Sequence, residues 1–90
     1  MAKIKVTKPT SAELEKMNVT SWGTWGCEVS VFDWTYDNTE TCYILDGRVI
    51  VKTDEGETEI KAGDLVTFSK DLSCTWDVKK AIRKHFRFGD

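Results

Sequence analysis

Two side chains of this sequence combine chemical reactivity with aromatic neighbours: Glu40 and Cys74. Both lie in segments where apolar and polar residues alternate, a pattern that predicts half-buried β-strands. Side chains two residues apart on a strand share a face and lie about 6.5–7 Å apart, so Glu40 and Cys42 can face one cavity. A carboxylate there needs a partner, because burying a bare charge is costly. The candidate partners are the Tyr36 hydroxyl, a tryptophan indole N–H, a bound cation or a substrate.

The same alternation predicts that aromatic side chains line this cavity together with Glu40. The predicted ligand pocket consists of Trp34, Tyr36, Glu40, Cys42, Cys74 and Trp76. The aromatic members either fill the core or stack on a flat or sugar-like ligand, and both roles are compatible if they line a cavity.

The metal-binding capacity of the chain is limited by its histidine content. The single histidine, His85, alternates with Arg83 and Arg87, so we expect it at the surface. One histidine excludes a multi-histidine metal site within one subunit. Cys74 is by default a small buried apolar residue, and thiolate ligation or nucleophilic attack would need a base or metal beside it. We therefore expect no metal cofactor, and Glu40 and Cys74 are the candidate catalytic residues and the candidate ligands if a divalent metal does bind.

The elements that must position these side chains are short strands separated by turns. The segment from Thr10 to Glu13 matches a capping box and predicts a short helix that ends near Met17. Residues 18–26 are predicted to form a loop that docks two tryptophans, and Asp46-Gly47 predicts a hairpin. The predicted strands are residues 2–6, 28–36, 39–45, 48–53, 57–60, 65–68, 73–78 and 81–88. Strands of this length with regular turn signals are typical of a sandwich or barrel.

Two groups of residues resemble, in type and spacing, the two motifs of the cupin superfamily: Trp34, Tyr36, Glu40 and Gly47, then Gly63, Asp64 and Cys74. In typical cupins the first motif supplies two histidines and a glutamate, and the second supplies a third histidine; together they hold a divalent metal. In this sequence Trp34 and Tyr36 stand at the first two histidine positions. Glu40 keeps the carboxylate, and Cys74 stands at the third histidine position.

The resemblance narrows to small single-domain cupins similar to the cupin domain of (S)-ureidoglycine aminohydrolase. It rests on five segments in order, residues 34–36, 40–47, 61–68, 74–76 and 83–86, and covers residues 22–88. It implies one cupin domain over residues 1–90: an all-β, jelly-roll-like antiparallel β-barrel with a short N-terminal helix. The aminohydrolase is a manganese enzyme that releases ammonia from ureidoglycine, but its histidine ligands do not carry over to this sequence.

Charge and composition exclude several classes of partner. The 90 residues carry a net charge of −2, which argues against nucleic-acid binding because phosphate neutralisation needs a positive excess. The basic run of residues 79–87 is expected to be a solvent-facing strand. The N-terminus has no signal-peptide pattern, and no segment approaches the ~20 apolar residues of a membrane span. Three cysteines without a secretion signal favour a reduced, cytoplasmic protein, in which a Cys42–Cys74 disulfide is not expected.

Three functions remain open from the sequence. The first is binding of a small molecule in the aromatic pocket without a histidine-based metal site. The second is a metal-dependent enzyme that acts on a C–N bond, with Glu40 as acid, base or ligand and Cys74 as ligand. The third is a structural or self-association domain, in which the edge strand of residues 2–6 pairs across a homodimer.

Overall fold

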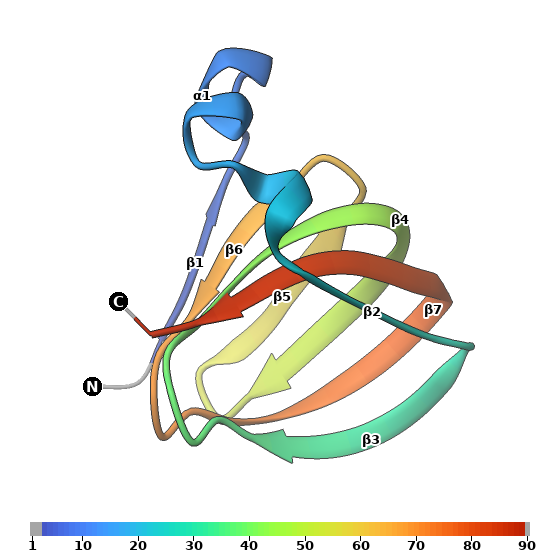
Figure 1. Ribbon diagram of the computed structural model, residues 1–90. Helices are drawn as coiled ribbons and strands as arrows, with labels where there is room; N and C mark the ends of the chain where they lie inside the picture. Colours follow the sequence, from blue (N-terminus) through green and yellow to red (C-terminus); the bar gives the residue numbers. More distant parts are fainter. Residues whose placement is uncertain (1–2, 90) are drawn as a thin grey trace.

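The computed structural model describes residues 3–89, which form a small antiparallel barrel with one short helix outside it (Figure 1). The elements are β1 (Ile4–Thr7), α1 (Ser11–Lys16), the 3-10 helix η1 (Val19–Ser21), β2 (Gly23–Cys27), β3 (Ser30–Thr35), β4 (Glu40–Thr53), β5 (Gly56–Lys61), β6 (Leu65–Phe68) and β7 (Ser73–Phe88). The strands belong to one seven-stranded antiparallel sheet. The expected fold class, all-β with a short N-terminal helix, is confirmed.

The long strands β4 and β7 pair with each other and curve through the molecule, so each contributes to two layers (Figure 1). In one layer the first half of β4 pairs with β6, the second half of β7 pairs with β2, and β1 extends the edge beside β6. In the other layer the second half of β4 pairs with β5, and the first half of β7 pairs with β3. The barrel is therefore a sheet that is folded over along its two central strands.

Two predicted chain breaks are wrong because these strands continue through them. Asp46-Gly47 makes no hairpin: β4 runs on, and its register against β7 shifts beside Ile44, Asp46 and Arg48. Gly47 has a φ of 100°, which allows an irregularity of the β-bulge type that bends a strand without reversing it. The predicted strands of residues 73–78 and 81–88 are likewise one strand, β7.

The N-terminal segment combines one confirmed and one wrong prediction. The Thr10 hydroxyl accepts from the Glu13 N–H and the Glu13 carboxylate accepts from the Thr10 N–H, so the capping box is present. The predicted loop of residues 18–26 is wrong at its end, because residues 23–27 form β2. The close approach of β2 to β7 favours glycine at position 26, because a Cβ there would lie 2.8 Å from the Ile82 carbonyl oxygen. Within the predicted edge strand of residues 2–6, Ala2 lies outside the described residues, and β1 begins at Ile4.

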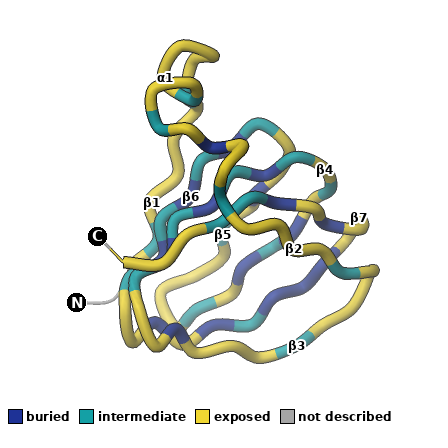
Figure 2. Tube along the Cα trace, viewed as in Figure 1, coloured by how far each residue is buried: buried dark blue, intermediate teal, exposed yellow. Residues whose placement is uncertain are grey.

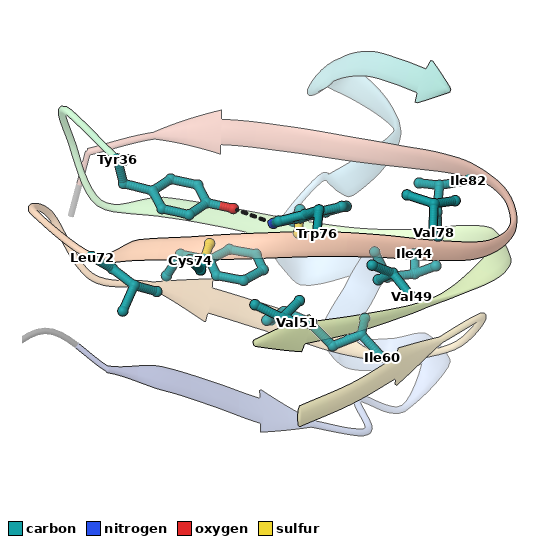
Figure 3. Close-up of a cluster of buried hydrophobic side chains, with 13 residues drawn as sticks. Tyr36, Ile44, Val49, Val51, Ile60, Leu72, Cys74, Trp76, Val78 and Ile82 are labelled. Carbon is teal, nitrogen blue, oxygen red and sulfur yellow. Dashed lines mark hydrogen bonds between the residues drawn. The ribbon is translucent and has the colours of Figure 1, made fainter. Parts of the chain in front are cut away.

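The core lies between the two layers and uses the inward residues of β4, β5, β6 and β7 (Figure 2). Its buried members are Tyr36, Cys42, Ile44, Val49, Val51, Ile60, Val66, Phe68, Leu72, Cys74, Trp76, Val78 and Ile82. Figure 3 shows how most of these side chains converge from opposite strands. The core fills the barrel on the side of β5 and β6, and the space beside β2 and β3 is left to a pocket.

Candidate ligand pocket

A pocket of about 520 Å³ lies among β2, β3, the start of β4 and β7. Seven of its eleven lining residues are aromatic, and one acidic and one basic side chain are among the others. The lining residues are Trp25, Cys27, Ser30, Phe32, Trp34, Tyr36, Glu40, Trp76, Lys84, Phe86 and Phe88. Rings on its rim, Trp25, Trp34 and Phe88, remain 37%, 49% and 56% exposed, whereas Trp76 is 2% exposed. The pocket therefore opens to solvent past flat apolar surfaces and closes on buried groups.

The polar centre of the pocket is an ion pair between Glu40 of β4 and Lys84 of β7. Lys84 Nζ donates to Glu40 Oε2 at 2.5 Å, and the two side chains are only 7% and 5% exposed. The register places Lys84 opposite Ile44, so its long side chain runs along the sheet to reach Glu40. Each charge compensates the other, which is the condition for burying either of them.

Three aromatic rings lie close to the Lys84 ammonium. Its Nζ lies 4.9 Å from the ring centre of Trp76, 5.1 Å from that of Trp25 and 6.0 Å from that of Phe86. Ring faces carry partial negative charge, and a desolvated cation at this distance gains about 2 kcal/mol. The basic run was expected to be wholly solvent-facing; Lys84 contradicts this, being held inside by a carboxylate and three rings.

Tyr36 and Trp76 form the wall between the pocket and the core. Trp76 Nε1 donates to the Tyr36 hydroxyl at 3.2 Å, and the Tyr36 ring stacks on Phe68 with ring centres 4.7 Å apart (Figure 3). Burial strongly raises the pKa of Tyr36, and the nearby Glu40 charge adds to the effect. The hydroxyl therefore stays protonated, accepts from the indole and keeps its own hydrogen free to donate.

Tyr36→Phe should destabilise the protein by about 1–3 kcal/mol, because it leaves the buried Trp76 N–H without an acceptor. The free energy of unfolding in urea, followed by circular dichroism, measures this cost. Tyr43→Phe is the matched control, since Tyr43 is a half-buried tyrosine of β4 outside the pocket. Equal stability of Tyr36→Phe and Tyr43→Phe would contradict the structural role of the hydroxyl.

The six residues predicted from the sequence to line the pocket divide into two groups. Trp34, Tyr36, Glu40 and Trp76 do line it, but Cys42 and Cys74 do not. Cys42 lies two residues after Glu40 on β4, opposite Phe86 and Val66, and is fully buried. Cys74 is a core residue beneath Tyr36 and Trp76 (Figure 3). Both thiols are free, as is that of Cys27, the cysteine that borders the pocket.

Burial keeps the two inner thiols protonated. It raises the pKa of Cys42 to about 12 and that of Cys74 to about 11. A thiol, unlike a thiolate, is a poor nucleophile and metal ligand. In this state Cys74 acts as a small apolar core residue, the default expectation for it.

Because the thiol pKa values are raised in the folded protein, the free energy of unfolding should fall as pH rises in the alkaline range. Above about pH 8.5 the unfolded chain releases its thiol protons while the folded chain still holds them. The thiol contribution is therefore complete below that pH and is lost as pH rises toward the folded value of about 12 for Cys42. We expect Cys42→Ala to lose less stability than the wild type between pH 8 and 10, measured by urea unfolding. Identical pH slopes in the two proteins would contradict this.

Lys84 and Trp25 line the pocket but were not predicted from the sequence. For Lys84, the sequence does contain a pattern that indicates burial. On the C-terminal half of β7, period-two alternation puts Lys84 on the same face as Ile82, Phe86 and Phe88, between apolar neighbours. A lysine in the middle of an apolar face indicates a buried cation with a partner. Trp25 was missed because its segment was predicted to be a loop. His85, expected at the surface, is half-buried, with Nδ1 3.4 Å from the Thr24 hydroxyl.

The donor set does not fit the divalent metal that a cupin first motif implies. Trp34 and Tyr36 replace two imidazoles, and an indole ring offers a metal no lone pair. Cys74 does not line the pocket, and Lys84 already supplies the positive charge beside Glu40. Across residues 3–89, no three histidine, cysteine, aspartate or glutamate side chains lie close enough to hold a metal ion.

The folded-over antiparallel barrel and the pocket at its mouth define the chain as a cupin. Residues 14–86 match the family model described as the EutQ-like cupin domain, and the chain belongs to this family. No curated protein has a significantly similar sequence. The general resemblance to cupins is thus confirmed, whereas none of these comparisons points to ureidoglycine aminohydrolase in particular.

Solved structures agree with this assignment. A DUF861 family protein from Thermotoga maritima is 48% identical, with a TM-score of 0.94 over 97% of this chain and 100% of that one. The EutQ protein of Clostridium difficile is 20% identical, with a TM-score of 0.66 over 94% of this chain and 66% of that one. A DUF1255 protein of unknown function from Acidithiobacillus ferrooxidans is 17% identical, with a TM-score of 0.65 over 69% and 60% of the two chains. The last two likenesses show the fold alone.

Among the residues that the structure describes, no helix has the length and apolar character needed to cross a membrane.

Proposed function

We propose that the protein binds a small, planar, largely apolar molecule in the aromatic pocket, without a metal ion. The observation that carries the proposal is an open space of about 520 Å³ that is walled by aromatic rings and contains one buried ion pair. Small-molecule sites are typically concave, about 300–1,000 Å³ in volume, mostly apolar, and equipped with a few placed polar groups. A residual packing defect would lack both the volume and the polar centre.

The arrangement of the rings supports a planar occupant. Phe32 and Trp76 are close to parallel, with an interplanar angle of 22° and ring centres 6.0 Å apart. Trp25 stands edge-on to both of them, at 66° and 84°. These rings contact one another in the stacked and edge-on arrangements that aromatic pairs prefer, and together they form an aromatic wall against which a flat ligand can pack.

The rival enzyme hypothesis, a metal-dependent reaction at a C–N bond, has weaker support. Its proposed ligands are separated, because Glu40 lines the pocket and is paired with Lys84, whereas Cys74 belongs to the core. Elemental analysis of protein purified without chelator distinguishes metal-free binding from a metal-dependent enzyme. A stoichiometric divalent metal that is lost in Glu40→Gln would overturn the metal-free proposal.

A homodimer through β1 remains a separate prediction, which light scattering tests.

Calorimetric titration with indole and with 2-naphthol tests the proposal. Both are neutral flat probes, and we expect saturable binding accompanied by an increase in melting temperature. Trp34→Ala removes a rim ring and should weaken binding about three- to tenfold, the worth of one aromatic contact. Trp22→Ala is the matched control, because Trp22 packs against Arg87 and does not line the pocket. The absence of saturable binding, or equal losses in the two variants, would overturn the proposal.

A further inference from the structure

We infer that the Glu40–Lys84 pair selects the polar group of the ligand, and that the pocket takes an uncharged aromatic amide or lactam. This inference rests on the proposed function, because it assigns a ligand class to the same pocket. Three properties of the pocket support this ligand class: its net charge, its hydrogen-bonding groups and its aromatic walls.

The net charge of the pocket favours a neutral ligand. Glu40 and Lys84 are the two charged side chains of the lining, and they compensate each other at 2.5 Å. A ligand carboxylate that approached Lys84 would lie beside Glu40, and a ligand ammonium that approached Glu40 would lie beside Lys84. Either charge would lose its hydration and meet a like charge in a site walled by apolar rings, which is costly. A neutral molecule avoids both costs.

The hydrogen-bonding groups of the pair are complementary to a –CO–NH– group. The Lys84 ammonium has three N–H donors and no acceptor, whereas the Glu40 carboxylate has only acceptor sites. One bond, from Nζ to Oε2, joins them. A donor and an acceptor held side by side match a ligand carbonyl that accepts from Lys84 and a ligand N–H that donates to Glu40. The Tyr36 hydroxyl, which accepts from Trp76, offers a further donor to a second ligand acceptor.

The walls require that this polar group be attached to a ring. Apart from the ion pair, Tyr36, Ser30 and Cys27, the lining is made of tryptophan and phenylalanine side chains. An aliphatic amide would leave these faces uncovered, whereas an aryl amide or a fused lactam covers them and keeps its polar edge at the pair. Stacking on aromatic rings then adds to binding without adding charge.

Calorimetry with three matched probes tests the inference: 2-naphthamide, 2-naphthoate and 2-naphthylmethylammonium. They share one ring system and differ in the charge and hydrogen-bonding pattern of one group. We expect 2-naphthamide to bind at least about tenfold more tightly than either charged probe, as hydrogen bonds to charged groups allow. If either charged probe binds as tightly as the amide, the inference fails while the proposed function stands. If neither these probes nor 2-naphthol bind, the proposed function itself fails.

A double variant, Glu40→Leu with Lys84→Met, assigns the selectivity to the pair. It removes both charges together, so no uncompensated charge is left in the barrel, and circular dichroism verifies that it folds. We expect its preference for 2-naphthamide to fall below about threefold. Lys80→Met is the matched control, because Lys80 is an exposed lysine of the same strand, and it should keep the tenfold preference. A double variant that keeps the full preference would overturn the inference.

Discussion

Lys84→Met is expected to destabilise the protein by about 3–5 kcal/mol, the usual cost of removing one partner from a buried ion pair. The loss arises because Glu40, with a side chain only 5% exposed, would lose the ammonium that compensates its buried carboxylate. The interactions of the ammonium with Trp25 and Trp76 disappear as well. Urea unfolding at neutral pH, followed by circular dichroism and tryptophan fluorescence, measures the change.

The double variant Glu40→Leu with Lys84→Met provides the control for this prediction. Replacing a whole buried pair with apolar residues of similar size is often neutral or stabilising, so the double variant should be more stable than Lys84→Met alone. The two substitutions should therefore be strongly non-additive: with a neutral double variant, the coupling energy is at least the ~3–5 kcal/mol that Lys84→Met alone costs. Additive effects would show that Glu40 and Lys84 do not act as a pair. A Lys84→Met protein as stable as the wild type would contradict the prediction altogether.

Gly47→Ala is expected to have an effect of similar size, about 3–5 kcal/mol, for a reason unrelated to the pocket. Gly47 has a φ of 100°, which costs a residue with a Cβ about 1–3 kcal/mol. In addition, the new Cβ would overlap the carbonyl oxygen of Ala81 and lie 2.8 Å from that of Lys80. These are backbone atoms of β7, so β4 and β7 must move apart at the point where both bend. Urea unfolding of the variant measures the combined cost.

Gly56→Ala separates the two contributions. Gly56 also has a positive φ, 127°, but a Cβ there would meet nothing within 4 Å. It should therefore show the conformational cost alone, about 1–3 kcal/mol. The excess cost of Gly47→Ala over Gly56→Ala measures the close approach of β4 and β7. Equal costs would show that the two strands tolerate a side chain at their crossing.

Much of the strand pattern could be predicted from local sequence because alternation and turn residues act over a few positions. The turns near Gly56, Gly63 and Asp71 are present, and the strands that follow the first two, β5 and β6, lie within a residue or two of their predicted bounds. The error in β4, at Gly47, has a physical cause. A glycine with positive φ serves both a hairpin and a bulge, and only the pairing partner decides which is formed. At Gly47 that partner is β7, more than thirty residues further along the chain.

The pocket shows a similar division between local and long-range information. Trp34, Tyr36 and Glu40 could be named from their positions in the first cupin motif and Trp76 from the alternation of its strand, and all four line the pocket. Faces of strands are also local, so Lys84 could be assigned to the face of Phe86 and Phe88. How deeply a side chain is buried depends on residues that are distant in sequence. Alternation puts Cys42 on the same face as Glu40, but it does not reveal that Phe86 and Val66 lie opposite Cys42.

The sequence by itself determined that the chain forms antiparallel strands, that an acidic residue faces aromatic ones, and that a histidine-based metal site cannot be built within one subunit. These conclusions depend on residue type and on period-two alternation, which the covalent chain carries directly. Only the tertiary structure decided that the partner of Glu40 is Lys84, because the two are 44 residues apart and meet through the register between β4 and β7. Strand pairing likewise buries Cys42 and Cys74 in the core, and the aromatic pocket lies beside the ion pair.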